Sequence, residues 1–299
     1  MRSRVTVAAA LLVAALVALS SLTTGCASSS GAAGQVDTSA TPVQVTRTFT
    51  QGDAMKYRFK VESQSGVKRI GYEQSIATSH ELKTTCTITK ADAEQTEMLM
   101  RFDYAVGGIT VGDQMTADKD AAALRGKELE FTLSPEGKVT GWTGLSGEAA
   151  LESGAGQFAM LFYDLFPTLP AEPMAVGMTW SEPYDVPDIT GDVNRDFVGE
   201  SVYTVRGFKR KYEIPCVEIG RTTTFEFEGR AEQGGEVWLM SGQGTMKGTI
   251  LISTVDGRLV WSTTDAELTL EGEGAAVASA AASGKVEMGV KSKLVIDLL

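Results

Sequence analysis

Long runs in which apolar and polar residues alternate constrain the fold of this chain more than any other feature of its sequence. In residues 55–62, Met55, Tyr57, Phe59 and Val61 alternate with four charged residues. Successive side chains of a β-strand point to opposite faces, so this pattern predicts a strand with one buried face and one face in water. Such strands are typical of antiparallel sheets, because parallel strands are usually covered on both faces.

The same period of two returns along most of the chain from about residue 46. The further alternating runs are residues 98–104, 129–133, 225–228, 266–271 and 286–298. Turn-forming residues separate the runs, among them Pro135-Glu136-Gly137 and Asp256-Gly257. We therefore predict one β-rich domain over residues 46–299, built as a curved antiparallel sheet or an open half-barrel.

One segment follows a different period. Its apolar residues recur at spacings of three and four, and they are Leu151, Ala155, Phe158, Phe162 and Leu165. This spacing places them on one face of a helix, and Pro167 is a stop signal directly after them. We expect one long amphipathic helix over about residues 147–166, packed on the sheet.

The predicted helix joins two halves, about residues 46–144 and 171–299, that look weakly alike. KELEFTLSPEG is followed by a strand with Trp142, and TILISTVDG is followed by a strand with Trp261. Two related halves would explain this likeness. Hairpins of similar chemistry also resemble one another by chance, so both interpretations stay open.

The start of the chain has the layout of a secretory signal peptide. Arg2 and Arg4 precede an uncharged apolar run, residues 5–19, which is followed by small residues and Cys26. Plain secretion and an uncleaved membrane helix are the alternatives, although the run is short for a membrane span. Residues 26–45 are dominated by Ala, Ser, Gly and Thr, so we predict a flexible tether there.

The sequence Leu22-Thr23-Thr24-Gly25-Cys26 resembles the end of a bacterial lipoprotein signal. In that family the bond before the cysteine is cut and the cysteine is lipidated. The resemblance implies that residues 1–25 are removed and that Cys26 anchors an exported protein to a membrane. The membrane would be the outer membrane in a diderm host and the outer face of the plasma membrane in a monoderm host.

The segment Leu169–Trp180 reads LPAEPMAVGMTW and follows a strand-rich half and a phenylalanine-rich segment. In this setting it resembles an uncharacterised family of bacterial exported lipoproteins, which has no established activity to transfer. The layout is also similar in architecture to lipoprotein-carrier folds, in which a curved antiparallel sheet holds acyl chains. Fold by itself does not determine function.

The composition argues against several functions. The formal net charge of −11 repels nucleic acid, so we expect no nucleic-acid partner. His80 is the only histidine, and we interpret it as a surface or strand-edge residue. We predict no enzymatic activity, no metal site and no cofactor. The chain has too few histidines and cysteines for imidazole-based catalysis or a His/Cys metal centre. A carboxylate-dependent hydrolase is the less favoured alternative.

Two cysteines remain after Cys26. Cys86 and Cys216 are an even pair in an exported protein, where a disulfide is permitted. A small buried apolar role is the alternative for each cysteine, and the spacing does not decide between them.

The positive candidates for a binding site are apolar. One set lies on a predicted strand and the other on the predicted helix: Met98, Met100, Phe102, Phe158, Met160, Phe162 and Phe166. They form either a solid core or a cavity for an apolar ligand, to which methionine adapts well. The sequence therefore favours a non-enzymatic, lipid-anchored cell-envelope protein that binds a lipid, another apolar ligand or an envelope protein partner. A structural or adaptor lipoprotein with a solid core is the alternative.

Overall fold

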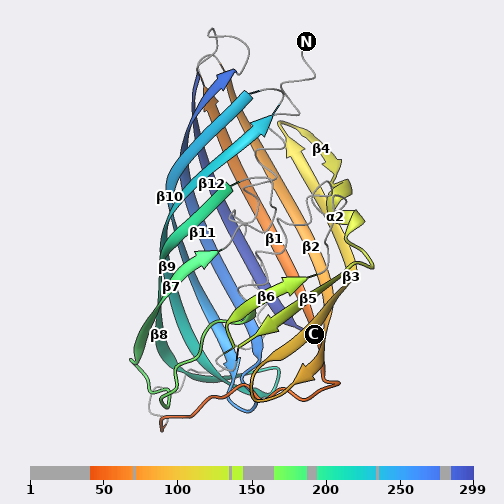
Figure 1. The fold of residues 1–299 in the computed structure, drawn as a ribbon, viewed down its shortest axis with the longest axis vertical. Coiled ribbons are helices and arrows are strands. Elements are labelled where there is room, and N and C mark those ends of the chain that lie inside the picture. Colours follow the sequence, from red (N-terminus) through yellow and green to blue (C-terminus); the bar gives the residue numbers. More distant parts are fainter. Residues whose placement is uncertain are drawn as a thin grey trace.

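The computed structural model describes residues 41–69, 72–134, 137–143, 165–186, 194–233, 236–276 and 284–299. In them the chain forms twelve strands and one short helix (Figure 1). Every strand pairing is antiparallel. The prediction of a mainly β, antiparallel fold is thus confirmed.

The first half of the chain contributes β1 (Ala54–Arg69), β2 (Tyr72–Ala91), β3 (Thr96–Val111), β4 (Gln114–Ala117), α2 (Lys119–Ala123), β5 (Glu128–Leu133) and β6 (Val139–Thr143). The second half contributes β7 (Thr179–Val186), β8 (Asn194–Lys211), β9 (Ile214–Gln233), β10 (Glu236–Ser253), β11 (Leu259–Ala276) and β12 (Gly284–Leu298). A strand of 20 residues, such as β2, spans roughly 65 Å.

All strands belong to one sheet in the order β6-β5-β3-β2-β1-β12-β11-β10-β9-β8-β7, and β4 pairs beside β3. Each half of the chain is a meander, and the pairing of β1 with β12 joins the two meanders. In the described residues the edge strands β6 and β7 do not pair with each other, so the sheet is open. Figure 1 shows the long strands running along the molecule in one curved layer.

The predicted long helix over residues 147–166 is not supported. Residues 144–164 lie outside the described residues, and the last two residues of the prediction form a 3₁₀ turn at Leu165 and a bend at Phe166. Leu165 and Phe166 bury their side chains in the core. The described part of the chain has no helix that is long and apolar enough to cross a membrane.

The two hairpins that look alike in sequence hold different places in the sheet. KELEFTLSPEG contributes to β5, next to the edge strand β6, whereas TILISTVDG contributes to β10 in the interior. They are the fifth and the fourth strands of their halves. Their likeness therefore does not map one half onto the other.

The inward, concave face of the sheet carries two apolar clusters. The lower cluster, near β5 and β6 in Figure 1, includes Met55, Tyr57, Phe59, Leu82, Cys86, Met98, Met100, Phe102, Phe131, Ile250, Ile252 and Ile296. The upper cluster consists of Val67, Ile76, Phe197, Phe225, Phe227, Met240, Met246, Ala266, Leu268, Leu270, Val286, Met288 and Val290.

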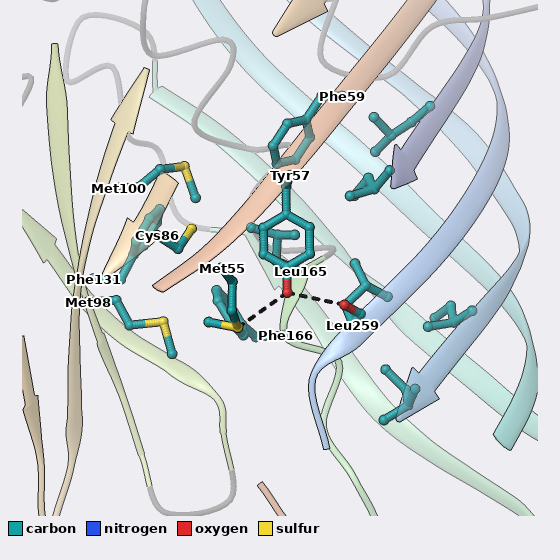
Figure 2. Close-up of a cluster of buried hydrophobic side chains, with 14 of the residues drawn as sticks. Met55, Tyr57, Phe59, Cys86, Met98, Met100, Phe131, Leu165, Phe166 and Leu259 are labelled. Atoms are coloured by element: carbon teal, nitrogen blue, oxygen red, sulfur yellow. Dashed lines mark hydrogen bonds between the residues drawn. The ribbon is translucent and has the colours of Figure 1, made fainter. Parts of the chain in front are cut away.

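The lower cluster is closed by chain from outside the sheet. Val45 joins it from the segment before β1, and Met174 joins it from the segment before β7. These two segments pair with each other through the backbone bridge between Val43 and Met174. Leu165 and Phe166 also join it, and the rings of Phe131 and Phe166 pack edge to face with centroids 6.5 Å apart (Figure 2). A second layer of this kind is what a sheet face needs to form a solid core.

Tyr57 ties the lower cluster together. Its hydroxyl donates to the carbonyl oxygen of Leu259 at 3.2 Å and lies 3.5 Å from Met55 Sδ (Figure 2). Burial raises the pKa of this phenol well above its usual range, so the hydroxyl stays a donor. The bond reaches from β1 across β12 to β11.

We predict that Phe102→Ala lowers the free energy of unfolding by about 3–5 kcal/mol, because it opens a cavity in this closed core. Val106→Ala is the matched control on the other face of β3, where the side chain is 42% exposed, and should change stability by less than about 0.5 kcal/mol. Urea unfolding measures both. Equal costs for the two variants would contradict the assignment of inward and outward faces.

Candidate functional site

A belt of buried polar side chains separates the two apolar clusters on the concave face. Its members are Ser63, Ser65, Thr78, His80, Ser201, Arg221, Thr223, Ser262, Thr264 and Ser292. They occupy inward positions of the strands that carry apolar residues above and below. A polar group in such a place is costly unless it is hydrogen-bonded, so the belt is the part of this face that packing alone does not explain.

Cross-strand register places eight of these ten residues in two adjacent rows, with Ser65 one row above them, opposite Val290, and Ser262 one row below, opposite Ile296. One row runs Thr78–Ser63–Ser292 and continues through apolar positions to Thr223 and Ser201. The other runs from His80 through Val61, Leu294, Thr264, Gly248 and Arg221 to Tyr203. The belt thus crosses the sheet from β2 to β8.

Arg221 is the buried cation of the belt, with only 5% of its surface exposed. It lies on β9 opposite Gly248 of β10, which in turn lies opposite Thr264 of β11. Arg221 Nη2 donates to Thr264 Oγ1 at 3.0 Å, so the guanidinium reaches across the whole width of β10. The absence of a side chain at Gly248 leaves this path open.

His80 and Asp118 form a hydrogen-bonded pair at the β2 end of the belt. His80 Nε2 lies 2.7 Å from Asp118 Oδ2, and both side chains are buried. Asp118 is also the N-cap of α2 and accepts from the backbone N–H groups of Asp120 and Ala121. The pair therefore fixes α2, whose Ala121 and neighbouring Leu124 join the lower cluster, to the middle of β2.

A close approach at Gly107 makes this pair possible. Gly107 lies opposite His80 in the β2–β3 register. A Cβ at position 107 would be 2.2 Å from His80 Cδ2 and 2.7 Å from Nε2, so the imidazole crosses β3 directly over the glycine.

Hydrogen bonds lower the pKa of Asp118 below its ordinary value of 3.8. Burial acts in the opposite direction, but the bond to His80 and the bonds from the backbone N–H groups of Ala121 and Asp120 outweigh it. The carboxylate is therefore the form that the folded protein prefers.

The hydroxyl groups of the belt fall into two kinds. Ser63 pairs with Thr78, and Ser201 pairs with Thr223, each at 2.8 Å between oxygens. By contrast, Ser262 Oγ and Ser292 Oγ are buried and have no hydrogen-bond partner within the described residues. Ser262 is two residues before Thr264 on β11 and lies opposite Ile296 of β12. Ser292 lies on the other side of Thr264, as the diagonal neighbour of Thr264 on β12.

The edge strand β7 sets the charge at one end of the belt. Tyr203 stacks on Trp180 with centroids 5.1 Å apart and donates to Glu182 Oε1 at 2.5 Å. Arg47 lies close enough to Glu182 to interact with it, and burial lowers the pKa of Arg47 to about 10. Acidic and basic groups thus face each other at this end.

The structure brings together four of the seven apolar candidates. Met98, Met100, Phe102 and Phe166 are all buried in the lower cluster (Figure 2). Phe158, Met160 and Phe162 lie outside the described residues, as does Cys26. A ligand-binding role for this set stays a prediction.

Cys86 and Cys216 are free thiols in this structure, so the disulfide that the sequence permits is not present. Cys86 belongs to the lower cluster on the concave face. Cys216 packs with Leu251 and Val260 in a separate cluster on the outward face. The sheet itself separates the two sulfur atoms, and burial raises the pKa of both thiols.

His80 differs from its interpretation as a surface or strand-edge residue. It lies in the interior of the 20-residue strand β2, at an inward position. Extending the alternation backwards from Leu82 would have placed His80 and Thr78 inward. The same extension of register beyond Val61 would have placed Ser63 and Ser65 inward and so indicated the belt.

No cluster of three or more His, Cys, Asp or Glu residues that could hold a metal ion occurs among the residues described. No family model and no curated protein sequence matches the chain.

Solved structures give a likeness of fold. The lipovitellin chain studied for its lipid–protein interactions superposes with a TM-score of 0.50 at 10% identity, over 84% of this chain and 25% of that chain. This chain thus spans about a quarter of the length of lipovitellin. An outer-membrane channel from Pseudomonas putida F1 has a TM-score of 0.24 at 10% identity, over 85% of this chain and 97% of the channel. Only the lipovitellin likeness is close enough to support the fold, that of a large antiparallel sheet.

We predict that Gly107→Ala destabilises the fold by about 1–3 kcal/mol, because the added methyl group overlaps the His80 ring. Gly66→Ala is the control, since no atom lies within 4 Å of a Cβ there. In a His80→Ser background the cost of Gly107→Ala should fall to that of Gly66→Ala. Thermal unfolding of the double-mutant cycle measures the coupling, and additive costs would contradict it.

A second prediction concerns pH. Because the folded-state pKa of Asp118 lies below 3.8, its carboxylate stabilises the fold fully above that pH, and the stabilisation is lost as pH falls through the lowered pKa. The difference in unfolding free energy between the natural protein and Asp118→Asn should therefore be larger at about pH 5 than at about pH 3. Urea unfolding at both pH values tests this, and a difference independent of pH would refute it.

Proposed function

We propose that this protein is a non-enzymatic, lipid-anchored protein of the cell envelope that binds a lipid or another apolar ligand on the concave face of its sheet. The observation that carries the proposal is the upper cluster. It is a broad cluster of buried apolar side chains on the concave face, and all of its described members come from that sheet.

The contrast with the lower cluster supports this assignment. The lower cluster receives Val45, Leu165, Phe166 and Met174 from segments outside the sheet. Among the described residues, no such segment contributes to the upper cluster. One apolar sheet face needs a second layer, and a bound hydrocarbon chain can supply it.

The side chains of the upper cluster suit an apolar ligand. Met240, Met246 and Met288 supply three flexible thioethers, and methionine adapts its shape to irregular ligands. Phe197 lies between Phe225 and Phe227, with ring centroids 5.8 and 4.8 Å away. The hydrophobic part of a lipid would find both shape adaptation and a large contact area there.

The likeness to lipovitellin agrees with lipid binding. That protein was studied for its lipid–protein interactions. At 10% identity this is an analogy of fold, and it adds to the argument from the concave face without replacing it.

Residues 1–26 support the cellular location. The charged start, the apolar run and Cys26 fit an exported lipoprotein, and the acidic mature chain fits a protein held at a membrane by its lipid. A structural or adaptor role is the competing proposal, favoured by the closed packing of the lower cluster. In that case an envelope protein would be the partner.

Native mass spectrometry of the full chain carrying Cys26→Ser tests the proposal, because this variant removes the lipid anchor from the measured mass. We expect a stoichiometric apolar ligand. Met288→Gln, which places an amide in the upper cluster, should lower the occupancy at least about tenfold. Met115→Gln, at a side chain 72% exposed, should leave it unchanged.

Met98→Gln separates binding from stability. It places the same amide in the lower cluster, so it should lower the melting temperature while the occupancy of the folded protein is retained. A chain that stays free of ligand after incubation with membrane lipids would reject the binding function and leave the structural role.

A further inference from the structure

We propose that the polar belt recognises the anionic headgroup of an amphiphile, with Arg221 in direct contact with the headgroup and the hydrocarbon chain lying on the upper cluster. This inference rests on the proposed lipid-binding function and names the chemical class of the ligand. The shared chemistry is an anionic oxygen group, carboxylate or phosphate, on an acyl chain.

The first reason is the position of Arg221. A buried guanidinium is retained where planar, charged oxygen groups are bound, since its N–H donors match carboxylate and phosphate. Arg221 points to the concave face, and its bond to Thr264 Oγ1 holds the far end of the side chain in place over Gly248. The donor group is therefore positioned before a ligand arrives.

The second reason is the pair of hydroxyl groups beside Thr264. Ser262 Oγ and Ser292 Oγ are buried without a hydrogen-bond partner in the described part of the chain. Buried hydroxyl groups in folded proteins nearly always have a partner. A headgroup oxygen next to Arg221 would accept a hydrogen bond from Ser292, which lies on the upper-cluster side of Thr264, opposite Ala266.

The third reason is the arrangement of charge along the belt. Glu182 lies on the β7 side, held by Tyr203, which is the cross-strand neighbour of Arg221. An anion would avoid that side. Thr264, Ser262 and Ser292 lie on the other side of Arg221, toward β11 and β12, where the described belt has hydroxyl groups and no carboxylate.

Arg206 shows that the same construction also exists without burial. Its guanidinium lies over Gly220 of β9, and Nη1 donates to Thr249 Oγ1 of β10 at 3.0 Å on the outward face. Arg206 therefore bridges strands in water. The two arginines differ mainly in the face of the sheet that they occupy, which makes Arg206 a matched control.

Isothermal titration calorimetry of the full chain carrying Cys26→Ser tests the inference with dodecanoate, dodecyl phosphate and dodecanol. We expect one or both anions to bind at least about tenfold more tightly than the alcohol. Arg221→Gln should abolish that preference and leave dodecanol binding in place, whereas Arg206→Gln should retain the preference. Preference for the phosphate would point to a phospholipid, and preference for the carboxylate to a free fatty acid.

Equal binding of the alcohol and the anions, or an anion preference that survives Arg221→Gln, would overturn the headgroup site while the lipid-binding function stands. Binding of none of the three probes would overturn both. If Arg221→Gln does not fold, Arg221→Lys decides, because it keeps the charge and loses the planar fork. In Arg221→Lys the preference for the anions over dodecanol should weaken but persist. If that preference stays unchanged while dodecanol still binds tightly, the role of Arg221 is refuted.

Discussion

The pairing of β1 with β12 is the interaction on which the rest of the structure depends. Its register runs from Tyr57 opposite Leu298 to Arg69 opposite Val286. The other pairings join strands of the same half of the chain. Without β1–β12 the described strands would form two separate sheets, and neither the concave face nor the belt would be continuous. On the outward face, Arg58 and Asp297 form a 2.7 Å salt bridge across this pairing.

The belt depends directly on that junction. The row Thr78–Ser63–Ser292 crosses from β2 through β1 to β12, so a slip of one residue in the junction would turn Ser292 outward. The pairing is also the most non-local one in the fold, and such contacts form slowly because a long loop must close first. The ends of the chain thus control both the shape of the face and the alignment of its polar groups.

Two glycines let polar side chains cross neighbouring strands. Gly107 admits the His80 ring on its way to Asp118, and Gly248 lies beneath the path from Arg221 to Thr264. In each case a polar side chain on one strand is held by a partner two elements away. This gives the middle of the concave face fixed polar groups, whereas the apolar clusters on both sides are held by packing.

The sequence alone determined the strands, their antiparallel character and their inward faces, because the period of two in residues such as Met55, Tyr57, Phe59 and Val61 is a local property of the backbone. The same alternation, extended to Ser63 and His80, would have placed these polar residues on the inward face and so predicted the belt. A single polar residue, however, does not show which side it faces until the register of its strand is known. The predicted long helix has no support, because only Leu165 and Phe166 of its residues belong to the described part of the chain. Only the tertiary structure decided that the first and last strands pair, that Cys86 and Cys216 lie on opposite faces, and that Arg221 reaches Thr264. Those facts depend on contacts between residues far apart in the chain, which no local pattern specifies.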